Sequence, residues 1–334
     1  MKEHFEIDNI PVGKNHPAYI IAEMSANHLQ SIERAKNIML AAKNAGANAV
    51  KLQSFRPDTI TIDCMGEEFM ATKGSPWEGQ NLYHLYEKAY MPWDWHKDLF
   101  LYAKEIGITI FSSPFDPTAV DLLEELNAPA YKIASYEILD IPLIKKCAKT
   151  GKPIILSTGI ATLSDIELAV DACKKEGNDQ IAILKCISQY PTPYGDLNLR
   201  TIPNLVETFG CVAGLSDHSM GSAVDIAAVT LGASIIEKHL TLKRSDGGPD
   251  GLFSMEPDEF SQMVSDVRNI ECALGKVNYG LTPFQTKGRK NARSLYVVKD
   301  VKAGELFTAE NVRSIRPGRG LPPRYYADIL GRAA

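Results

Sequence analysis

The stretch "AYIIAEMSANHLQSIERAKNIMLAAKNAGANAVKLQSF", residues 18–55, decides the fold class of this chain. It opens with an apolar run from Ala18 and closes with another from Ala49, and both have the length of buried β-strands. Between them, "SIERAKNIMLAAKNAG" repeats apolar residues at helical spacing, and Gly46 supplies a C-terminal stop. A strand, an amphipathic helix and a second strand predict a right-handed crossover between parallel strands.

The same alternation continues to about Leu240 and gives eight apolar runs in all. They are "AYIIAEM" from Ala18, "AVKLQSF" from Ala49, "TIFSSPF" from Thr109, "AYKIASY" from Ala130, "PIILSTG" from Pro153, "IAILKCI" from Ile181, "VAGLSDH" from Val212 and "SIIEKHL" from Ser234. Eight strands that alternate with helices predict an α/β fold, a closed (β/α)8 TIM barrel. The periodic segment 256–275 would be the eighth helix.

Beyond the predicted barrel the hydrophobic periodicity of the sequence changes. A chain of 334 residues exceeds the size of one hydrophobic core, so a second domain is expected. "KVNYGLTPFQTKGRKN" after Gly275 has no hydrophobic period, and the sequence from Ala292 is rich in short strands and turns. We therefore predict a barrel domain over residues 1–275, a linker over 276–290 and a small β-rich domain over 291–334.

Charge and composition exclude several classes of protein. The net charge of -5 argues against a nucleic-acid partner, and no apolar run is long enough to span a membrane. Six cysteines without C-x-x-C spacing predict reduced thiols in a cytoplasmic protein. The start, "MKEHFEIDNI", lacks the apolar region of a signal peptide.

Polar side chains gather at the carboxyl ends of the predicted strands, where a barrel places its catalytic groups. The set comprises two lysines, several hydroxyls, an amide and two carboxylates: Lys51, Lys132, Ser112, Ser113, Ser135, Ser157, Ser188, Ser216, Gln53, Glu23 and Glu137. Two cations with several hydroxyl donors predict a site for phosphate and carboxylate groups, as in phosphoenolpyruvate. Either lysine is also suited to a Schiff base, and Ser112, Ser157 and Ser216 are alternatively helix caps.

Two histidines end neighbouring strands. His218 in "LSDH" and His239 in "EKH" close strands seven and eight, so their imidazoles are expected to converge on one divalent cation. Glu237 shares the face of His239 but is equally a structural partner, and it is left out of the ligand set. Asp217 and Asp250 are each a candidate for sugar hydroxyls or for a helix cap, with Asp250 in "GGPDG" the better one.

These blocks resemble a known family, the sialic-acid (nonulosonic acid) synthases. The matching blocks are "IIAE-x-x-x-NH", "GA-x-x-VK-x-Q", "SSPF", "AYKIAS-x-E", "LSTG", "YPTPY", "GLSDH" and "EKH", and the resemblance continues into a C-terminal antifreeze-like (SAF) domain. It implies phosphoenolpyruvate contacts for the two lysines and the serines, and a divalent metal ion (Mn2+, Mg2+ or Co2+) on His218 and His239. It also implies sugar contacts for Glu23 and Glu137, and we expect one of these carboxyl groups to assist the addition of water as a catalytic group.

For the sugar, the resemblance implies contacts from Gln53, Tyr190, Asp250 and Phe253, and from Arg316 of a neighbouring subunit in a domain-swapped homodimer. Within the family, "YMPWDWH" from Tyr90 and "LFSMEP" from Leu252 resemble pseudaminic acid synthases, because Phe253 stands where other members carry a polar residue. An apolar wall favours a deoxy sugar.

The expected reaction is therefore the condensation of phosphoenolpyruvate with 2,4-diacetamido-2,4,6-trideoxy-L-altrose and water to give pseudaminic acid and phosphate. An N-acetylneuraminate or legionaminate synthase that uses a manno-configured sugar is the first alternative. A Schiff-base aldolase and a non-catalytic carbohydrate-binding barrel are the others. Two features depart from the family pattern: Ser188 stands where many members have Asn, and the chain ends at "LGRAA", which predicts a shortened C-terminal domain.

Overall fold

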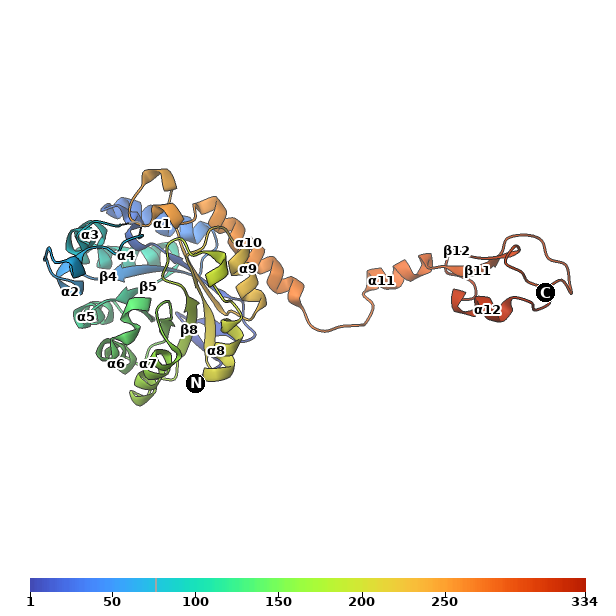
Figure 1. Ribbon diagram of the computed structural model, residues 1–334, viewed down its shortest axis with the longest axis horizontal. Coiled ribbons are helices and arrows are strands. Elements are labelled where there is room, and N and C mark those ends of the chain that lie inside the picture. Colours follow the sequence, from blue (N-terminus) through green and yellow to red (C-terminus); the bar gives the residue numbers. More distant parts are fainter. Residues whose placement is uncertain (76) are drawn as a thin grey trace. The chain divides into compact units, whose positions relative to one another are not determined.

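The computed structural model describes residues 1–75 and 77–334, and its main feature is a closed eight-stranded parallel barrel (Figure 1). Its strands follow one another around the ring in chain order, and the last pairs with the first. They are β3 (Tyr19–Glu23), β4 (Ala49–Ser54), β5 (Thr109–Pro114), β6 (Tyr131–Ile133), β7 (Ile154–Ser157), β8 (Ile181–Cys186), β9 (Val212–Asp217) and β10 (Ile235–His239). The TIM barrel that the sequence predicts is confirmed.

Helices surround the barrel, as Figure 1 shows. They are α1 (Ile32–Asn44), α2 (Pro57–Ile60), α3 (Leu82–Ala89), α4 (Trp93–Ile106), α5 (Pro117–Glu125), α6 (Ile141–Lys149), α7 (Leu163–Lys175), α8 (Thr201–Phe209), α9 (Ala223–Thr230) and α10 (Pro257–Leu274). The eighth helix, α10, lies where the sequence predicts it. In the described residues, no helix is both long and apolar enough to cross a membrane.

The alternation of each strand sorts its side chains into two cores. One set packs outward against the helices, as Val50 and Leu52 of β4 do. The other set points inward and fills the part of the barrel nearer the amino ends of the strands. It comprises Tyr19, Ile21, Ala49, Phe111, Ala130, Ile155, Ala182, Leu184, Val212 and Ile235. Because neighbouring residues of a strand point to opposite faces, the inward residues beyond this apolar layer are the polar ones at the strand ends.

A short hairpin closes the amino end of the barrel. Strands β1 (His4–Ile7) and β2 (Ile10–Gly13) pair antiparallel, and Phe5, Ile7 and Val12 pack into the apolar layer of the interior. Each of these three side chains is buried. The barrel interior is therefore sealed at this end and polar at the other.

Helix caps come from residues other than the three serines named as possible caps. Asp116 caps α5, Asp140 caps α6 and Thr162 caps α7, each by accepting a backbone N–H through its side chain. Ser157 and Ser216 lie within or at the end of their strands and face the barrel interior. The hydroxyls of Ser157 and Ser216 are thus free of the capping role.

Residues 276–334 form a second compact unit. It contains α11 (Pro283–Gly288), the antiparallel pair β11 (Ser294–Val297) and β12 (Val312–Ile315), and α12 (Tyr326–Ile329). Helix α11 lies within the segment predicted as a linker, where Thr282 and Gln285 form a capping box. All six cysteines of the chain are free thiols.

Candidate active site

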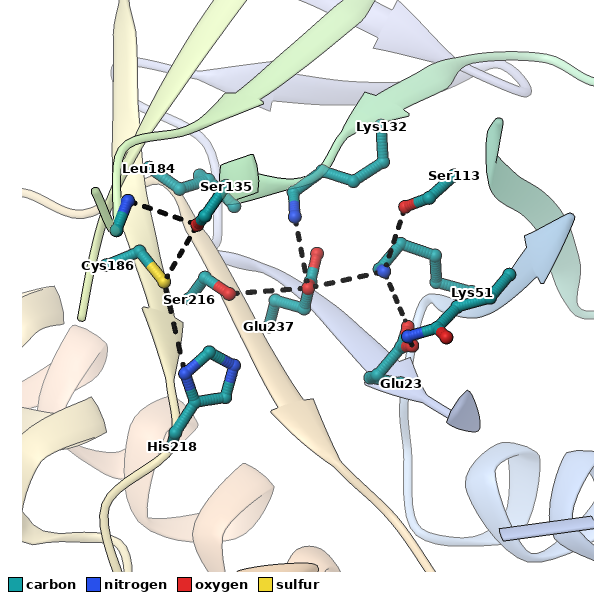
Figure 2. Close-up of polar contacts among 12 residues, drawn as sticks. Glu23, Lys51, Ser113, Lys132, Ser135, Leu184, Cys186, Ser216, His218 and Glu237 are labelled. Carbon is teal, nitrogen blue, oxygen red and sulfur yellow. Dashed lines mark hydrogen bonds and ion pairs between the residues drawn. The ribbon is translucent and has the colours of Figure 1, made fainter. Parts of the chain in front are cut away.

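A cluster of buried charges occupies the polar end of the barrel. Figure 2 shows the Glu237 carboxylate between the ammonium groups of Lys51 and Lys132, at 3.5 and 3.3 Å. Ser216 on the next strand donates to the same carboxylate oxygen at 3.3 Å. Sequence reasoning left Glu237 out of the site, although its spacing from His239 places both on the inner face. It lies at the centre of the cluster.

Glu23, Gln53 and Ser113 complete this cluster on the side of β3 to β5. Lys51 Nζ lies 2.7 Å from Glu23 Oε2 and donates to Ser113 Oγ at 3.1 Å. Gln53 Nε2 donates to the other oxygen of Glu23 at 2.9 Å. Register explains the meeting, because Glu23 pairs with Lys51 across β3 and β4, and Gln53 pairs with Ser113 across β4 and β5.

Burial and mutual attraction shift the pKa values of this cluster in opposite directions. Burial raises the pKa of Glu23 to about 7, although Lys51 opposes the shift. Burial also lowers the pKa of Lys132, with Glu237 opposing it. For Glu237 burial is outweighed by the two lysines, so its pKa is lowered and the carboxylate is ionised. For Lys51 burial is outweighed by Glu23 and Glu237, so its pKa is raised.

The two serines that sequence reasoning named together lie on opposite faces of β5. Ser113 points to Lys51, whereas Ser112 points outward, where its hydroxyl lies 2.7 Å from Ser54 Oγ. Ser54 in turn lies 2.7 Å from Nε2 of the buried His96 on α4. Ser112 therefore belongs to a structural hydrogen-bond chain behind the barrel wall, and the prediction that it contacts the substrate does not fit its position. Strand alternation is the physical reason.

This difference gives a paired prediction. Ser113→Ala removes a partner of the Lys51 ammonium, so we expect the KM for phosphoenolpyruvate to rise about 10-fold. Ser112→Ala should leave that KM unchanged but reduce the free energy of unfolding by about 1–2 kcal/mol, because it deprives buried Ser54 of a partner. Steady-state kinetics and denaturant melts on both variants check the pair. A higher KM in Ser112→Ala alone would reverse the assignment.

A hydroxyl-lined cradle lies beside the lysines at the ends of β6 to β8. Ser135 accepts from the Gly159 amide at 3.0 Å, and a methyl group at Gly159 would lie 2.1 Å from Ser188 Oγ. Gly159 is therefore needed for these two serines to approach each other. The hydroxyls of Ser157 and Ser188 are buried without a hydrogen-bond partner among the described residues. Orphaned donors of this kind suit the oxygens of an anionic ligand.

Cys186 is a further neighbour of this cradle that sequence reasoning missed. Its thiol lies 3.5 Å from Ser135 Oγ and 3.9 Å from Nδ1 of His218 (Figure 2). Burial would raise the pKa of this thiol, but His218 outweighs it and lowers the value to about 7. The signal was available, because Cys186 follows Ala182 and Leu184 on the inward face of β8.

The two histidines converge above the charged cluster, with ring centroids 5.2 Å apart. His218 Nδ1 lies 2.9 Å from the Ile187 carbonyl oxygen and must donate to it, which leaves Nε2 as a possible ligand atom. His239 Nδ1 is buried without a hydrogen-bond partner in the described structure. Burial holds the pKa of His239 well below its ordinary range, and the neighbouring charge of His218 lowers it further, so this imidazole is neutral.

This donor set fits a divalent cation that keeps most of its other ligands as water or substrate. Two imidazoles supply nitrogen atoms of the kind that first-row metals bind. No group of three or more His, Cys, Asp or Glu side chains within residues 1–75 and 77–334 has the geometry of a complete metal site. That a cation is held by His218 and His239 stays a prediction.

An aromatic wall faces the histidines. The Tyr190 ring lies 4.3 Å from that of His218, and Phe253 lies 5.1 Å from His239 and 5.0 Å from Tyr190. Trp77, which sequence reasoning missed, extends the wall at 5.9 Å from Tyr190 and donates its indole N–H to the Pro249 carbonyl at 3.1 Å. Its segment between η2 (Glu67–Phe69) and α3 carries no periodic signal that would have placed it there.

Asp250 precedes Phe253 by three residues and is buried. Its carboxylate accepts from the Ser25 hydroxyl and, at 3.3 Å, from the Ala26 amide. Burial raises its pKa, although the Ser25 hydrogen bond opposes the shift. Asp250 thus ties the loop after β10 to the loop after β3, and Ser25 is a partner that sequence reasoning did not name.

Arg316 belongs to the second unit, where its side chain is exposed.

Glu137 lies in the turn η3 (Ser135–Leu139) after β6, and its Oε2 is buried without a partner in the described residues. Burial raises its pKa to about 7. In the unfolded chain this carboxyl ionises near 4.5, so folding takes up a proton between these values. The contribution of Glu137 to the free energy of unfolding should therefore be greatest below pH 4.5 and should fall as the pH rises to about 7.

Glu137→Gln removes this ionisation. We expect the variant to gain stability over wild type as pH rises from 4.5 to 7, by at most about 1.4 kcal/mol per pH unit, and to lose catalytic activity. Denaturant melts at pH 4.5 and 7.5 check the gain. The exposed Glu125→Gln is the control, with the same difference from wild type at both values. A Glu137→Gln difference that does not change with pH would contradict the assignment.

Comparisons with known proteins show which family the chain belongs to. The model of the NeuB family matches residues 38–279, and the SAF domain model matches residues 292–334. The chain is 45% identical over 319 residues to the pseudaminic acid synthase of Helicobacter pylori, covering 95% of this chain and 94% of that one. It is 36% identical to the N,N'-diacetyllegionaminic acid synthase of Campylobacter jejuni, covering 94% and 95%.

Among solved structures, the N-acetylneuraminic acid synthetase of Leptospira borgpetersenii in complex with citrate superposes with a TM-score of 0.76 at 32% identity. That match covers 86% of this chain and 95% of the other. The predicted SAF domain is confirmed, and so is the resemblance stated from the strand-end blocks. The chain belongs to the NeuB family, the phosphoenolpyruvate-dependent synthases of nonulosonic acids.

Proposed function

We propose that this enzyme condenses phosphoenolpyruvate with 2,4-diacetamido-2,4,6-trideoxy-L-altrose and water to give pseudaminic acid and phosphate. Carbon 3 of phosphoenolpyruvate attacks the aldehyde carbon of the open-chain sugar and forms the new C–C bond. Water adds at carbon 2 and loses a proton, and the hemiketal phosphate then collapses to the 2-keto acid with loss of phosphate. The observation that carries the choice of sugar is the Phe253 ring, 3% exposed, against His239 and Tyr190.

Phosphoenolpyruvate would bind over the lysine cluster and the serine cradle. Lys51 and Lys132 supply positive charge, and Ser113, Ser135, Ser157, Ser188 and Ser216 supply hydroxyl donors. The unpartnered hydroxyls of Ser157 and Ser188 support this role. Glu237 balances the lysine charges before the substrate arrives, which lowers the cost of keeping two ammonium groups buried. Ser112 has no place in this set.

The aldehyde would bind next to His218 and His239. A divalent cation (Mn2+, Mg2+ or Co2+) on these imidazoles would polarise the aldehyde oxygen as a Lewis acid. The Ile187 carbonyl orients His218 through Nδ1, so the ring presents Nε2 to the site. Tyr190 packs against the His218 ring and keeps bulk water from that side.

Proton transfer falls to two carboxyl groups of raised pKa. Glu23 and Glu137 both have pKa values near 7, so at neutral pH each can take up or release a proton, as general acid–base catalysis requires. Either is suited to take the proton of the water that adds at carbon 2. Glu23 already holds Lys51 and Gln53, so it also orients the anion site, whereas the Glu137 oxygen Oε2 is unpartnered in the described structure.

The sugar's apolar end would lie against the aromatic wall. A methyl group at carbon 6 is favoured beside Phe253, whereas a hydroxyl there would lose its hydrogen bonds to water. Asp250 and Gln53 offer polar contacts to the acetamido and hydroxyl groups. The identity of 45% to a pseudaminic acid synthase supports the same choice over the legionaminic acid synthase at 36%.

Phosphate release with three aldehydes tests this proposal. The panel contains the trideoxy-diacetamido altrose, its manno isomer and N-acetylmannosamine, each with phosphoenolpyruvate and with or without chelator. Turnover with the altrose alone is expected. Preference for either manno sugar would keep the mechanism but overturn the assignment of Phe253 as the selecting wall. Phe253→Ser should raise the KM for the altrose more than that for phosphoenolpyruvate.

The second domain would act in trans. Arg316 is exposed, and we propose that it reaches the sugar site of a partner subunit in a domain-swapped homodimer. Sedimentation of wild type together with kinetics of Arg316→Ala checks this.

The Schiff-base aldolase suggested by the two buried lysines is disfavoured by the family, whose members use phosphoenolpyruvate. Borohydride should therefore trap no adduct on either lysine.

A further inference from the structure

Lys238 is a buried lysine that the chemistry above does not use. It stands on β10 between Glu237 and His239, which both face the barrel interior, so its side chain turns outward toward α9. Its side chain is 1% exposed. An ammonium group so deeply buried needs compensating oxygens, and their identity shows what the side chain connects.

Four oxygens surround the ammonium group, and all come from one short segment and the helix that follows it. Lys238 Nζ donates to the Asp217 carboxylate, to the Ser219 carbonyl at 2.8 Å and to the Gly221 carbonyl at 3.0 Å. The Asp225 carboxylate on α9 lies 3.5 Å away. Asp217 also accepts from the Ser219 amide and hydroxyl, at 2.8 and 2.9 Å.

His218 lies in this segment, between Asp217 and Ser219. Residues 217–221 wrap around the ammonium group, with Asp217 and two carbonyls turned outward to it. Since adjacent residues at a strand end point to opposite faces, fixing Asp217 outside the barrel fixes His218 inside. The peptide groups on both sides of Lys238 also carry Glu237 and His239, so one side chain links both histidine-bearing strands.

Stability alone is a poor explanation for these buried charges. A buried ion pair usually contributes no more than well-packed apolar residues of the same volume, because both charges lose their hydration. Here one lysine faces two carboxylates, and both Asp225 oxygens have no hydrogen bond within the described part of the chain. What the arrangement does provide is a fixed path for the loop after β9.

We propose that Lys238 is a positioning residue, which holds the loop of His218 against the strand of His239 so that the two imidazoles can share one divalent cation. The inference rests on the cation-binding role given to both histidines above. Partners that hydrogen-bond to a metal ligand typically change metal affinity by about 10- to 100-fold when replaced, and we expect an effect of this size from Lys238, which fixes the backbone on both sides of His218. The same change should reduce kcat and leave the KM for phosphoenolpyruvate within about 3-fold, because the lysine cluster lies on the inner face.

The test measures Mn2+ binding to the full-length protein without substrate, from the electron paramagnetic resonance signal of free Mn2+. Lys238→Met is expected to weaken the Kd for Mn2+ by about 10-fold or more. Lys185→Met is the matched control, since Lys185 is also an outward lysine of a barrel strand, but among residues 1–75 and 77–334 its ammonium donates to the Cys186 carbonyl alone. Its Kd should equal that of wild type.

Lys238→Met leaves two buried carboxylates and is at risk of not folding, so a neutral variant decides the outcome. The triple variant Asp217→Asn, Asp225→Asn and Lys238→Met removes all three charges, and thermal melts establish that it folds. Weak Mn2+ binding and low kcat in the folded triple variant support the proposal. Wild-type Kd and kcat overturn it. If the triple variant does not fold, Asp217→Asn alone is judged by the same two readouts.

His218→Ala separates this inference from the proposed function. If wild type binds Mn2+ no more tightly than His218→Ala, the cation site itself is wrong. If wild type binds more tightly and the Lys238 variants match it, only the positioning role is wrong.

Discussion

Lys132→Met is expected to reduce kcat/KM for phosphoenolpyruvate by about 10³-fold. Loss of one buried charged partner of an anion costs about 2–5 kcal/mol, and each 1.4 kcal/mol is tenfold. Lys132 and Lys51 both lie within 3.5 Å of Glu237, so removing one ammonium also leaves that carboxylate short of positive charge when the substrate arrives. Lys51→Met should be at least as damaging, because Lys51 additionally holds Glu23 and Ser113.

Phosphate release under subsaturating phosphoenolpyruvate measures the effect. Lys185→Met is again the control, because it lies in a barrel strand but faces outward, and its kcat/KM should remain within about 3-fold of wild type. Activity of Lys132→Met within 5-fold of wild type, roughly 1 kcal/mol, would show that this lysine does not contact the substrate.

His239→Ala is expected to bring phosphate release down to the uncatalysed background. A cation on His218 and His239 would supply several kcal/mol of charge stabilisation, and a single imidazole is a weak site. The two histidines should act as a unit, so His218→Ala and the double variant are expected to lose no more than His239→Ala does.

Added Mn2+ gives the sharpest form of this experiment. Wild type should lose activity with chelator and recover it with metal, whereas neither single variant should recover at any metal concentration. His84→Ala on the exposed face of α3 is the control. Full activity of the double variant would remove the metal assignment, and the aldehyde would then have to be polarised by other groups.

The barrel and most of its polar layer could be predicted because strand alternation is a local property. Lys51, Gln53, Lys132 and His239 stand at fixed spacing from apolar residues of the same face, so the sequence alone puts them inside. The choice between Ser112 and Ser113 needed the register of β5 against β4, which a pair of adjacent serines does not reveal. Glu237 had the correct spacing, but nothing local showed that two lysines from other strands meet its carboxylate.

Long loops were the part that sequence could not supply. Trp77 reaches Tyr190 only because its indole N–H finds the Pro249 carbonyl, more than 170 residues away in the chain. Ser25 similarly meets Asp250 across 225 positions. Such pairs depend on where loops from different strands end in space, and neither periodicity nor turn residues encode that. The oxygens that surround Lys238 are a third example. Strand alternation with Glu237 predicts that the Lys238 side chain points outward, but it does not predict which groups the side chain meets there.

The sealed amino end of the barrel has a kinetic consequence. Phe5, Ile7 and Val12 close that end. The ammonium groups of Lys51 and Lys132 contact Glu237, which lies two residues before His239 on β10 and is therefore nearer to the closed end than His239 is. Ligands therefore share a single entrance, and whatever binds deepest must enter first and leave last. We expect a compulsory order in which phosphoenolpyruvate precedes the sugar and inorganic phosphate is the final product to depart, so that phosphate competes with phosphoenolpyruvate but not with the aldehyde.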